Sequence, residues 1–275
     1  MLLITGANGQ LGNELRLLLG DNALYTDYAE LDITNAAEVR AFVNAHRVDM
    51  IVNCAAYTAV DKAESDEEKA YAINAVGPAN LAQAGVPLIH VSTDYVFDGA
   101  SCRPYVEDDV PNPATVYGRT KLAGEKHVLE NADTALVIRT AWLYSSFGNN
   151  FVKTMLRLGA ERDSLNVVFD QVGTPTYARD LAAAIVKIMP QLKPGMKGVY
   201  HFSDEGVCSW YDFAARIMDK AGLPCRVKPI ESVDYPTPAK RPFYSVLNKG
   251  KIKAAFGVDI PHWEKSLDDC LKKLL

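Results

Sequence analysis

The sequence predicts an α/β fold with a doubly wound parallel sheet and a smaller C-terminal α/β lobe. Three observations indicate this class. Short apolar runs alternate with segments of helical period through the first 140 residues. A glycine-rich turn joins the first apolar run to the first helical segment. After about residue 142 the apolar runs become shorter and prolines more frequent, which indicates a change of architecture.

The expected strands are short apolar runs, rich in β-branched residues and bounded by turn residues. They cover residues 2–5, 23–26, 48–54, 87–92 and 135–140. The expected helices have apolar residues at helical spacing, and they cover residues 10–19, 36–45, 67–84 and 117–130. Strands that alternate with helices run parallel, because each connection crosses over a face of the sheet.

The domain boundary is expected near residue 142, ahead of the turn signal Gly148-Asn149-Asn150. We expect a dinucleotide-binding domain of the Rossmann type over residues 1–142 and a discontinuous lobe that binds substrate, mainly over residues 143–275. Apolar runs at 167–168 and 185–188 predict that parts of residues 165–190 return to complete the first domain.

Composition and charge exclude several classes of protein. The chain of 275 residues is 48% hydrophobic with a net charge of −5, so it lacks the basic surface that nucleic acid requires. It contains no apolar run long enough to span a bilayer and no pattern of a secretory leader. Its five cysteines are scattered, which indicates reduced thiols in a cytoplasmic protein. No histidine has metal-ligand spacing, and the charge run at residues 61–69 is typical of a solvated helix face.

The segment TGANGQLG at residues 5–12 has glycines at 6, 9 and 12, between an expected strand and an expected helix. Gly6 allows the tight turn, Gly9 lets the backbone approach a pyrophosphate, and Gly12 lets helix and strand pack closely. The N–H groups at the start of the helix then face the phosphates. The pattern predicts a site for a nicotinamide dinucleotide, and an ordinary glycine-rich turn is the alternative.

Two acidic residues follow the second expected strand. Asp27 lies about 20 residues after the glycine loop, where a carboxylate binds the ribose hydroxyls of the adenosine. It disfavours a 2′-phosphate, and no Arg or Lys adjoins it, so we expect NADH to be accepted. Asp32 offers a second carboxylate suited to the adenine edge. A solvated loop carboxylate is the alternative for either residue.

A second pattern predicts ketone chemistry. Ser92 and Thr93 end a buried strand, at the sheet edge where α/β proteins bind ligands. Tyr117 and Lys121 are four residues apart, so they share one face of the expected helix. Ketone reduction requires an acid that protonates the oxygen, and a neighbouring Lys⁺ lowers the pKa of a phenol. We therefore expect Tyr117 to donate the proton, although a chance Tyr and Lys on a partly exposed helix is the alternative.

With these motifs the chain resembles the extended short-chain dehydrogenase/reductase family, and within it the branch that reduces dTDP-4-dehydrorhamnose. The resemblance extends over most of the chain. YxxxK is shared by the whole family, whereas the TAVDKAE and STDYVF blocks are more specific to this branch. The matching strings are TGANGQLG (5–12), VNCAAYTAVDKAE (52–64), STDYVFDG (92–99), YGRTKLAGE (117–125), RTAWLYSSFGNNF (139–151) and YPTPAKRPFYSVLN (235–248).

The resemblance implies reduction of the 4-keto group of dTDP-4-dehydro-β-L-rhamnose to dTDP-β-L-rhamnose with NADPH or NADH, the last step of dTDP-rhamnose biosynthesis. The catalytic residues that it implies are Thr93, Tyr117 and Lys121. Its cofactor-binding residues are Tyr117 and Lys121 together with Gly6, Gly9, Gln10, Leu11, Gly12, Asp27, Asp32, Ile33, Ala55, Ala56, Tyr57 and Val91. Its substrate-binding residues are Thr93, Asp94, Trp142 and Arg241. A core position is the alternative for Trp142, and a solvated surface position for Arg241.

The resemblance leaves the metal and the assembly open. Some members of the branch are magnesium-bridged dimers and others are monomers, so we expect a monomer or a homodimer. Glu14 is a candidate ligand for Mg²⁺. A lone Glu in a first helical turn is more typical of a favourable contact with the helix dipole, so no metal is assigned.

Two other functions fit the same motifs. The first is a non-catalytic regulatory subunit that binds nucleotide, because the beta subunit of methionine adenosyltransferase resembles this branch. Here Thr93, Tyr117 and Lys121 are all present, which favours an enzyme. The second is a related nucleotide-sugar reductase or epimerase with another stereochemical outcome, which depends on the shape of the pocket rather than on motifs.

Overall fold

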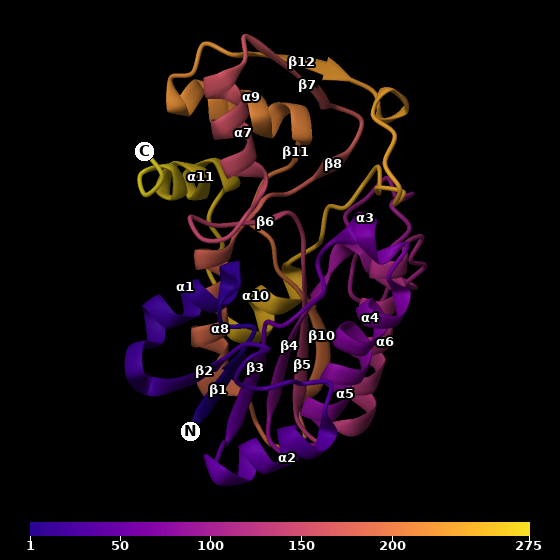
Figure 1. Ribbon diagram of the computed structural model, residues 1–275, viewed down its shortest axis with the longest axis vertical. Coiled ribbons are helices and arrows are strands. Elements are labelled where there is room, and N and C mark those ends of the chain that lie inside the picture. The colour runs from indigo at the N-terminus through magenta and orange to yellow at the C-terminus, as the bar shows by residue number, and fades with distance from the viewer.

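A six-stranded parallel sheet forms the centre of the lower half of the molecule in Figure 1, a computed structural model that describes residues 1–275. The strand order is β10-β5-β4-β3-β1-β2, and every neighbouring pair is parallel. From β1 the chain adds β2 on one side, and then adds β3, β4 and β5 in turn on the other side. This change of side between β1 and β3 leaves a crevice at their carboxyl ends. The strands are β1 (Leu2–Thr5), β2 (Ala23–Thr26), β3 (Met50–Asn53), β4 (Leu88–Thr93), β5 (Ala135–Thr140) and β10 (Lys197–His201).

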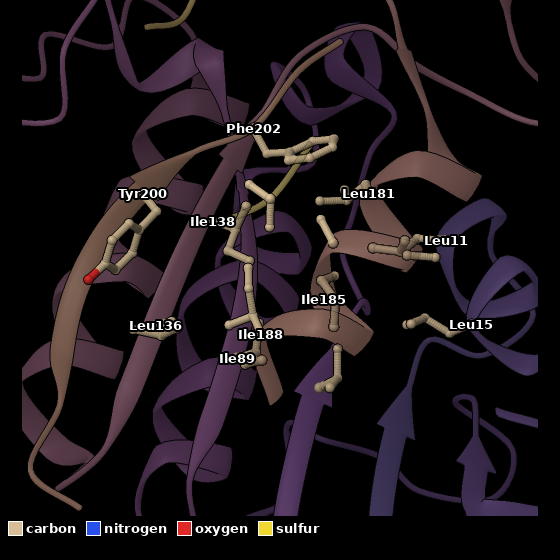
Figure 2. Packing of buried hydrophobic residues seen from close by; sticks show 14 of the residues in the cluster. Leu11, Leu15, Ile89, Leu136, Ile138, Leu181, Ile185, Ile188, Tyr200 and Phe202 are labelled. Atoms are coloured by element: carbon tan, nitrogen blue, oxygen red, sulfur yellow. The ribbon is translucent and has the colours of Figure 1, made fainter. Parts of the chain in front are cut away.

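Helices cover both faces of this sheet because successive strand residues point to opposite sides. On one face, α1 (Gln10–Leu19) and α8 (Ala178–Ile188) pack on β4, β5 and β10, and Figure 2 shows their side chains meeting. On the other face, α2 (Ala36–Ala45), α5 (Gly77–Ala82) and α6 (Val116–Asn131) pack on Leu3, Ile51 and Val137. The doubly wound parallel sheet expected from the sequence is confirmed.

The helix expected at residues 67–84 is interrupted. It consists of α4 (Glu67–Tyr71), a π-helical turn at Ala72–Val76 and α5. Pro78 has no N–H, so the carbonyl of Asn74 receives no hydrogen bond from it. Gly124 of α6 packs on that carbonyl, where a Cβ would lie only 2.1 Å from the oxygen. A short helix that the sequence pattern did not indicate, α3 (Val60–Ala63), precedes this stretch.

The upper lobe of Figure 1 has its own hydrophobic core. The helices α7 (Phe151–Glu161), α9 (Trp210–Ala221) and α11 (Trp263–Leu271) surround it. Its strands form three small pairs: β7 (Ser164–Val168) with β12 (Arg226–Ile230), β6 (Leu143–Tyr144) with β9 (Thr176–Tyr177), and β8 (Val172–Gly173) with β11 (Cys208–Ser209). Short 3₁₀ turns lie at Gly20–Asn22, Asp94–Val96, Met189–Gln191 and Ser232–Asp234.

The chain returns to the large sheet twice after the lobe begins. The helix α8 and the edge strand β10 form the first return, and α10 (Gly250–Phe256) forms the second. The short run KGVYH at β10 has no strong alternation, so the sequence did not indicate this sixth strand. We propose two discontinuous domains, with residues 178–202 and 250–258 belonging to the sheet domain. No helix of the structure is both long enough and apolar enough to cross a bilayer.

Candidate active site

A cleft of about 920 Å³ lies at the carboxyl ends of β1, β3 and β4. Thr5, Cys54 and Thr93 line it from the sheet, while Phe151 and Trp210 line it from the lobe. The cleft therefore occupies the crevice that the strand order creates, and it is bounded by both parts of the chain.

All but one of the site residues expected from the sequence lie in the wall of this cleft. They are Gly6, Gly9, Gln10, Leu11, Gly12, Asp27, Asp32, Ile33, Ala55, Ala56, Val91, Thr93, Asp94, Tyr117, Lys121, Trp142 and Arg241. The exception is Tyr57, whose ring packs beside Ala63 and Val116 and whose hydroxyl donates to Asp66 at 3.1 Å. The neighbouring Thr58 lines the cleft in its place.

The glycine loop is tightly constrained. Gly6 has φ +65°, and a Cβ there would lie 2.5 Å from the backbone nitrogen of Ala55. A Cβ on Gly12 would lie 2.5 Å from the carbonyl oxygen of Gly6. The helix α1 that follows begins without a side-chain cap, so its first N–H groups are left to a ligand. These features fit the pyrophosphate of a dinucleotide.

The two acidic residues of the loop region have different surroundings. The Asp27 carboxylate accepts hydrogen bonds from the N–H of Asn8 at 3.1 Å and of Tyr28 at 2.8 Å, which fixes it beside the glycine loop. The Asp32 carboxylate accepts from the N–H and hydroxyl of Thr34. The only cations in the cleft wall are Lys121 and Arg241, and neither belongs to this loop region.

The expected catalytic residues come together at one point of the wall. The Thr93 hydroxyl donates to the Asp94 carboxylate at 2.9 Å. Lys121, which is 1% exposed, donates from Nζ to the Val91 carbonyl at 2.7 Å. The Tyr117 ring lies edge-on to the Tyr95 ring, with centroids 5.5 Å apart. Because Tyr117 and Lys121 share one face of α6, the helix brings both groups to the carboxyl end of β4.

The electrostatics differ from the sequence expectation in one respect. Burial raises the pKa of the Tyr117 phenol, and the nearby Thr93 hydroxyl acts in the opposite direction. Burial lowers the pKa of Lys121 to about 8. Lys121 is not among the groups that shift the pKa of Tyr117, because its ammonium is turned to the Val91 carbonyl. The expected lowering by Lys121 is therefore not present in this state of the site.

Burial also raises the pKa of Asp94 to about 7, well above its unfolded value of about 3.9. Between these values the folded protein keeps a proton that the unfolded chain has lost, so stability falls as the pH rises from about 4 to 7. We expect Asp94→Asn to flatten this fall, measured by urea unfolding across that range. The exposed residue Asp108 supplies the control variant Asp108→Asn. If Asp94→Asn shows the same pH dependence of stability as the wild type, the raised pKa of Asp94 is not its cause.

Ser92 lines the cleft beside Thr93, but its hydroxyl is turned to the helix α6. It donates to Glu125 Oε1 at 2.5 Å. Glu125 also forms a buried ion pair with Arg139 of β5, with 2.7 Å between Oε2 and Nη2. Glu125 lies one helical turn after Lys121 and tends to raise the pKa of that lysine. This buried support beneath the catalytic helix was not identified from the sequence.

The lobe supplies an aromatic wall. Trp142, with φ +49°, stacks on Trp210 with ring centroids 3.6 Å apart and an interplanar angle of 9°. Phe151 packs against Trp210, with centroids 4.6 Å apart. The sequence indicated Trp142 but neither of the others, because their contact depends on how α7 and α9 pack in the lobe.

Glu14 is fully buried, and it lies in the second turn of α1 rather than in the first turn expected from the sequence. Its Oε1 accepts a hydrogen bond from Ser145 at 2.6 Å, and the Arg179 guanidinium lies 3.7 Å from Oε2. Lys273 Nζ of the lobe lies 4.0 Å from the same oxygen. The Glu14 charge therefore faces one cation from α8 and one from the lobe, and no metal is assigned to it.

The whole chain, residues 1–275, matches the family model described as the RmlD substrate binding domain. It is 44% identical over 284 residues to dTDP-4-dehydrorhamnose reductase of Aggregatibacter actinomycetemcomitans, with 97% of this chain and 96% of that protein covered. A crystal structure of a dTDP-4-dehydrorhamnose reductase from Clostridium acetobutylicum has a TM-score of 0.95 at 45% identity, with 99% of both chains covered. Another from Bacillus anthracis, solved in complex with NADP, has a TM-score of 0.95 at 40% identity and covers 99% of this chain and 98% of that chain. These names do not favour the regulatory-subunit alternative.

Proposed function

This chain belongs to the family described as the RmlD substrate binding domain, and from that premise we propose that it reduces dTDP-4-dehydro-β-L-rhamnose to dTDP-β-L-rhamnose with NADPH or NADH. The observation that carries the proposal is the convergence of Thr93, Tyr117 and Lys121 in one cleft beside an uncapped glycine-loop helix. The choice of substrate rests on the relatives named as dTDP-4-dehydrorhamnose reductases.

A nicotinamide cofactor, when bound, supplies the hydride. The glycine loop and the start of α1 would hold its pyrophosphate. Asp27, Asp32 and Ile33 would flank the adenosine. Ala55, Ala56 and Val91, which line the cleft between the loop and Tyr117, would contact the rest of the molecule.

The protein's own groups provide the acid and orient the ketone. Tyr117 gives its phenolic proton to the oxygen at C4 of the sugar as that oxygen gains charge. The Thr93 hydroxyl hydrogen-bonds the same oxygen and holds it toward the phenol. Lys121, protonated below a pKa of about 8, is held at the Val91 carbonyl and would bring its positive charge to the phenolate that remains by turning from that carbonyl. Thr93 and Lys121 are buried and Tyr117 is half-buried, which limits the access of water and strengthens these interactions.

Other residues of the cleft wall would hold the nucleotide sugar. Trp142, supported by Trp210, and Asp94 face the sugar, while Arg241 is suited to the diphosphate because a guanidinium binds phosphate oxygens in bidentate fashion. We also propose a cytoplasmic location, which the five unpaired cysteines support. A monomer or a homodimer is proposed, and light scattering distinguishes them.

The proposed function is tested by mixing the protein with dTDP-4-keto-6-deoxyglucose, the upstream epimerase and NADPH or NADH. We expect the absorbance of reduced nicotinamide to fall only when all components are present. No fall with either cofactor would overturn the proposal. A product other than dTDP-β-L-rhamnose, identified by NMR, would favour the related reductase or epimerase instead.

Asp27 is expected to set the choice between the two cofactors. Asp27→Asn keeps an acceptor for the Asn8 N–H but removes the charge that repels a 2′-phosphate. We expect the ratio of kcat/KM for NADPH over NADH to rise roughly tenfold, which corresponds to about 1.4 kcal/mol. Asp21→Asn, at an exposed residue outside the cleft, is the control. An unchanged ratio would mean that other residues select the cofactor.

A further inference from the structure

Asp61 is not the solvated helix-face charge that its place in the run at residues 61–69 indicates. It is the second residue of the short helix α3, and the residue before it, Val60, lines the cleft. Its Oδ2 lies 2.5 Å from Nη2 of Arg241, and its Oδ1 accepts a hydrogen bond from the N–H of Ala239 at 3.2 Å. Both carboxylate oxygens are thus used to hold a segment that lies about 180 positions further along the chain.

That segment, residues 233–242, has few other attachments. Prolines at 236, 238 and 242 have no N–H to donate. Two turn hydrogen bonds join its start to the preceding residues, from Asp234 and Tyr235 to carbonyls at 231 and 232. Three more join it to distant parts of the chain: the two to Asp61 and one from Arg241 Nη1 to the Tyr95 hydroxyl at 3.1 Å. Tyr235, close to its start, is 62% exposed. The backbone also packs at buried Ala239 and at Pro242 against Gly99, but the Arg241 guanidinium itself is held by its hydrogen bonds to Asp61 and Tyr95.

The same contacts lead to the catalytic tyrosine. Tyr95 is held edge-on against Tyr117 and receives the hydrogen bond from Arg241. Arg241 and Tyr95 both line the cleft. Asp61, Arg241 and Tyr95 consequently form a bridge that connects α3, the segment at 233–242 and the end of β4 beside Tyr117.

The guanidinium has five N–H donors. One is used by Asp61 and one by Tyr95, which leaves three for another acceptor. Arg241 is also partly exposed, with 24% of its side chain accessible. An anion entering the cleft can therefore bind Arg241 without displacing Asp61.

We propose that Asp61 is a positioning residue for the substrate: it holds Arg241 in the cleft wall so that the guanidinium can bind the diphosphate of the nucleotide sugar. The inference rests on the proposed function and adds a residue to it. Asp61 acts through Arg241, so its loss should weaken binding of the sugar nucleotide more than it slows the chemical step.

The test measures kcat and both KM values for Asp61→Asn with NADPH and the 4-keto sugar nucleotide. The asparagine Oδ1 still accepts the Ala239 N–H. The amide nitrogen that replaces Oδ2 is uncharged and cannot accept from a guanidinium, so the ion pair and hydrogen bond with Arg241 are lost. We expect the KM for the sugar nucleotide to rise about tenfold, equivalent to 1.4 kcal/mol, with kcat within about threefold and the KM for NADPH unchanged. Glu68→Gln, at an exposed residue of the same charge run, is the matched control and should match the wild type.

A double-mutant cycle with Arg241→Ala separates positioning from a general structural role. If Asp61 acts through Arg241, Asp61→Asn adds no further rise in KM to the Arg241→Ala variant. An additive rise in the double variant would overturn the inference. An unchanged KM in Asp61→Asn alone would also overturn it. A lower KM would overturn it too, because it would show that Asp61 competes with the substrate for the guanidinium. An inactive wild type would instead mean that the proposed function has failed.

Discussion

Replacement of Tyr117 by phenylalanine is expected to lower kcat by about 10²- to 10⁴-fold, the usual contribution of a positioned general acid. The ring remains and still packs edge-on to Tyr95, so the cleft keeps its shape. Only the proton for the C4 oxygen is lost. Fluorescence titration with NADPH should therefore give a dissociation constant close to that of the wild type.

Tyr95→Phe is the matched control, because Tyr95 lies beside Tyr117 and also carries a hydroxyl in the cleft. Its hydroxyl accepts a hydrogen bond from Arg241, so its loss should affect kcat by less than about tenfold. If Tyr117→Phe retains wild-type turnover, or if Tyr95→Phe is the more damaging change, the proton donor has been assigned to the wrong residue.

Removal of the Glu125 carboxylate is expected to cause the largest loss of stability. Glu125 and Arg139 are 2% and 3% exposed, and the carboxylate also accepts from Ser92. Glu125→Ala leaves the guanidinium buried without its partner, which costs about 3–5 kcal/mol in comparable pairs. For a chain of this size, the midpoint of thermal unfolding should fall by roughly 10 °C.

An exposed ion pair supplies the control for this prediction. Glu161 pairs with Arg157 on α7, and the two side chains are 53% and 61% exposed. Glu161→Ala should change the free energy of unfolding by less than about 1 kcal/mol. If the two variants lose the same free energy of unfolding, the buried pair stabilises α6 no more than an exposed pair stabilises α7.

The sheet domain could be predicted from the sequence because its signals are local. Each of the first five strands is a short apolar run, and the glycines at 6, 9 and 12 indicate the first turn. The edge strand β10 and the helix α10 lack such signals, since their place is set by contacts with residues far away in the chain. Pro78 is visible in the sequence, but a proline is also compatible with the first turn of a new helix, so its place alone did not indicate the π turn that precedes α5.

The site residues also fall into those with a local signal in the sequence and those without one. Thr93, Tyr117 and Lys121 lie at strand ends and on one helix face, so spacing alone indicated that they could meet. Tyr57 was expected in the cleft wall, but its hydroxyl is held by Asp66. Asp61 and Trp210 were missed because their roles depend on partners at Arg241 and Trp142, and no local pattern connects such distant positions.

The central claim is that hydride reaches C4 of a dTDP-linked keto sugar in this cleft. The most direct measurement uses NADPH with deuterium at both C4 positions of the nicotinamide, followed by mass spectrometry and NMR of the sugar nucleotide. The account predicts dTDP-β-L-rhamnose with one deuterium, located at C4 of the sugar. A product without deuterium, or with deuterium at another carbon, would contradict it.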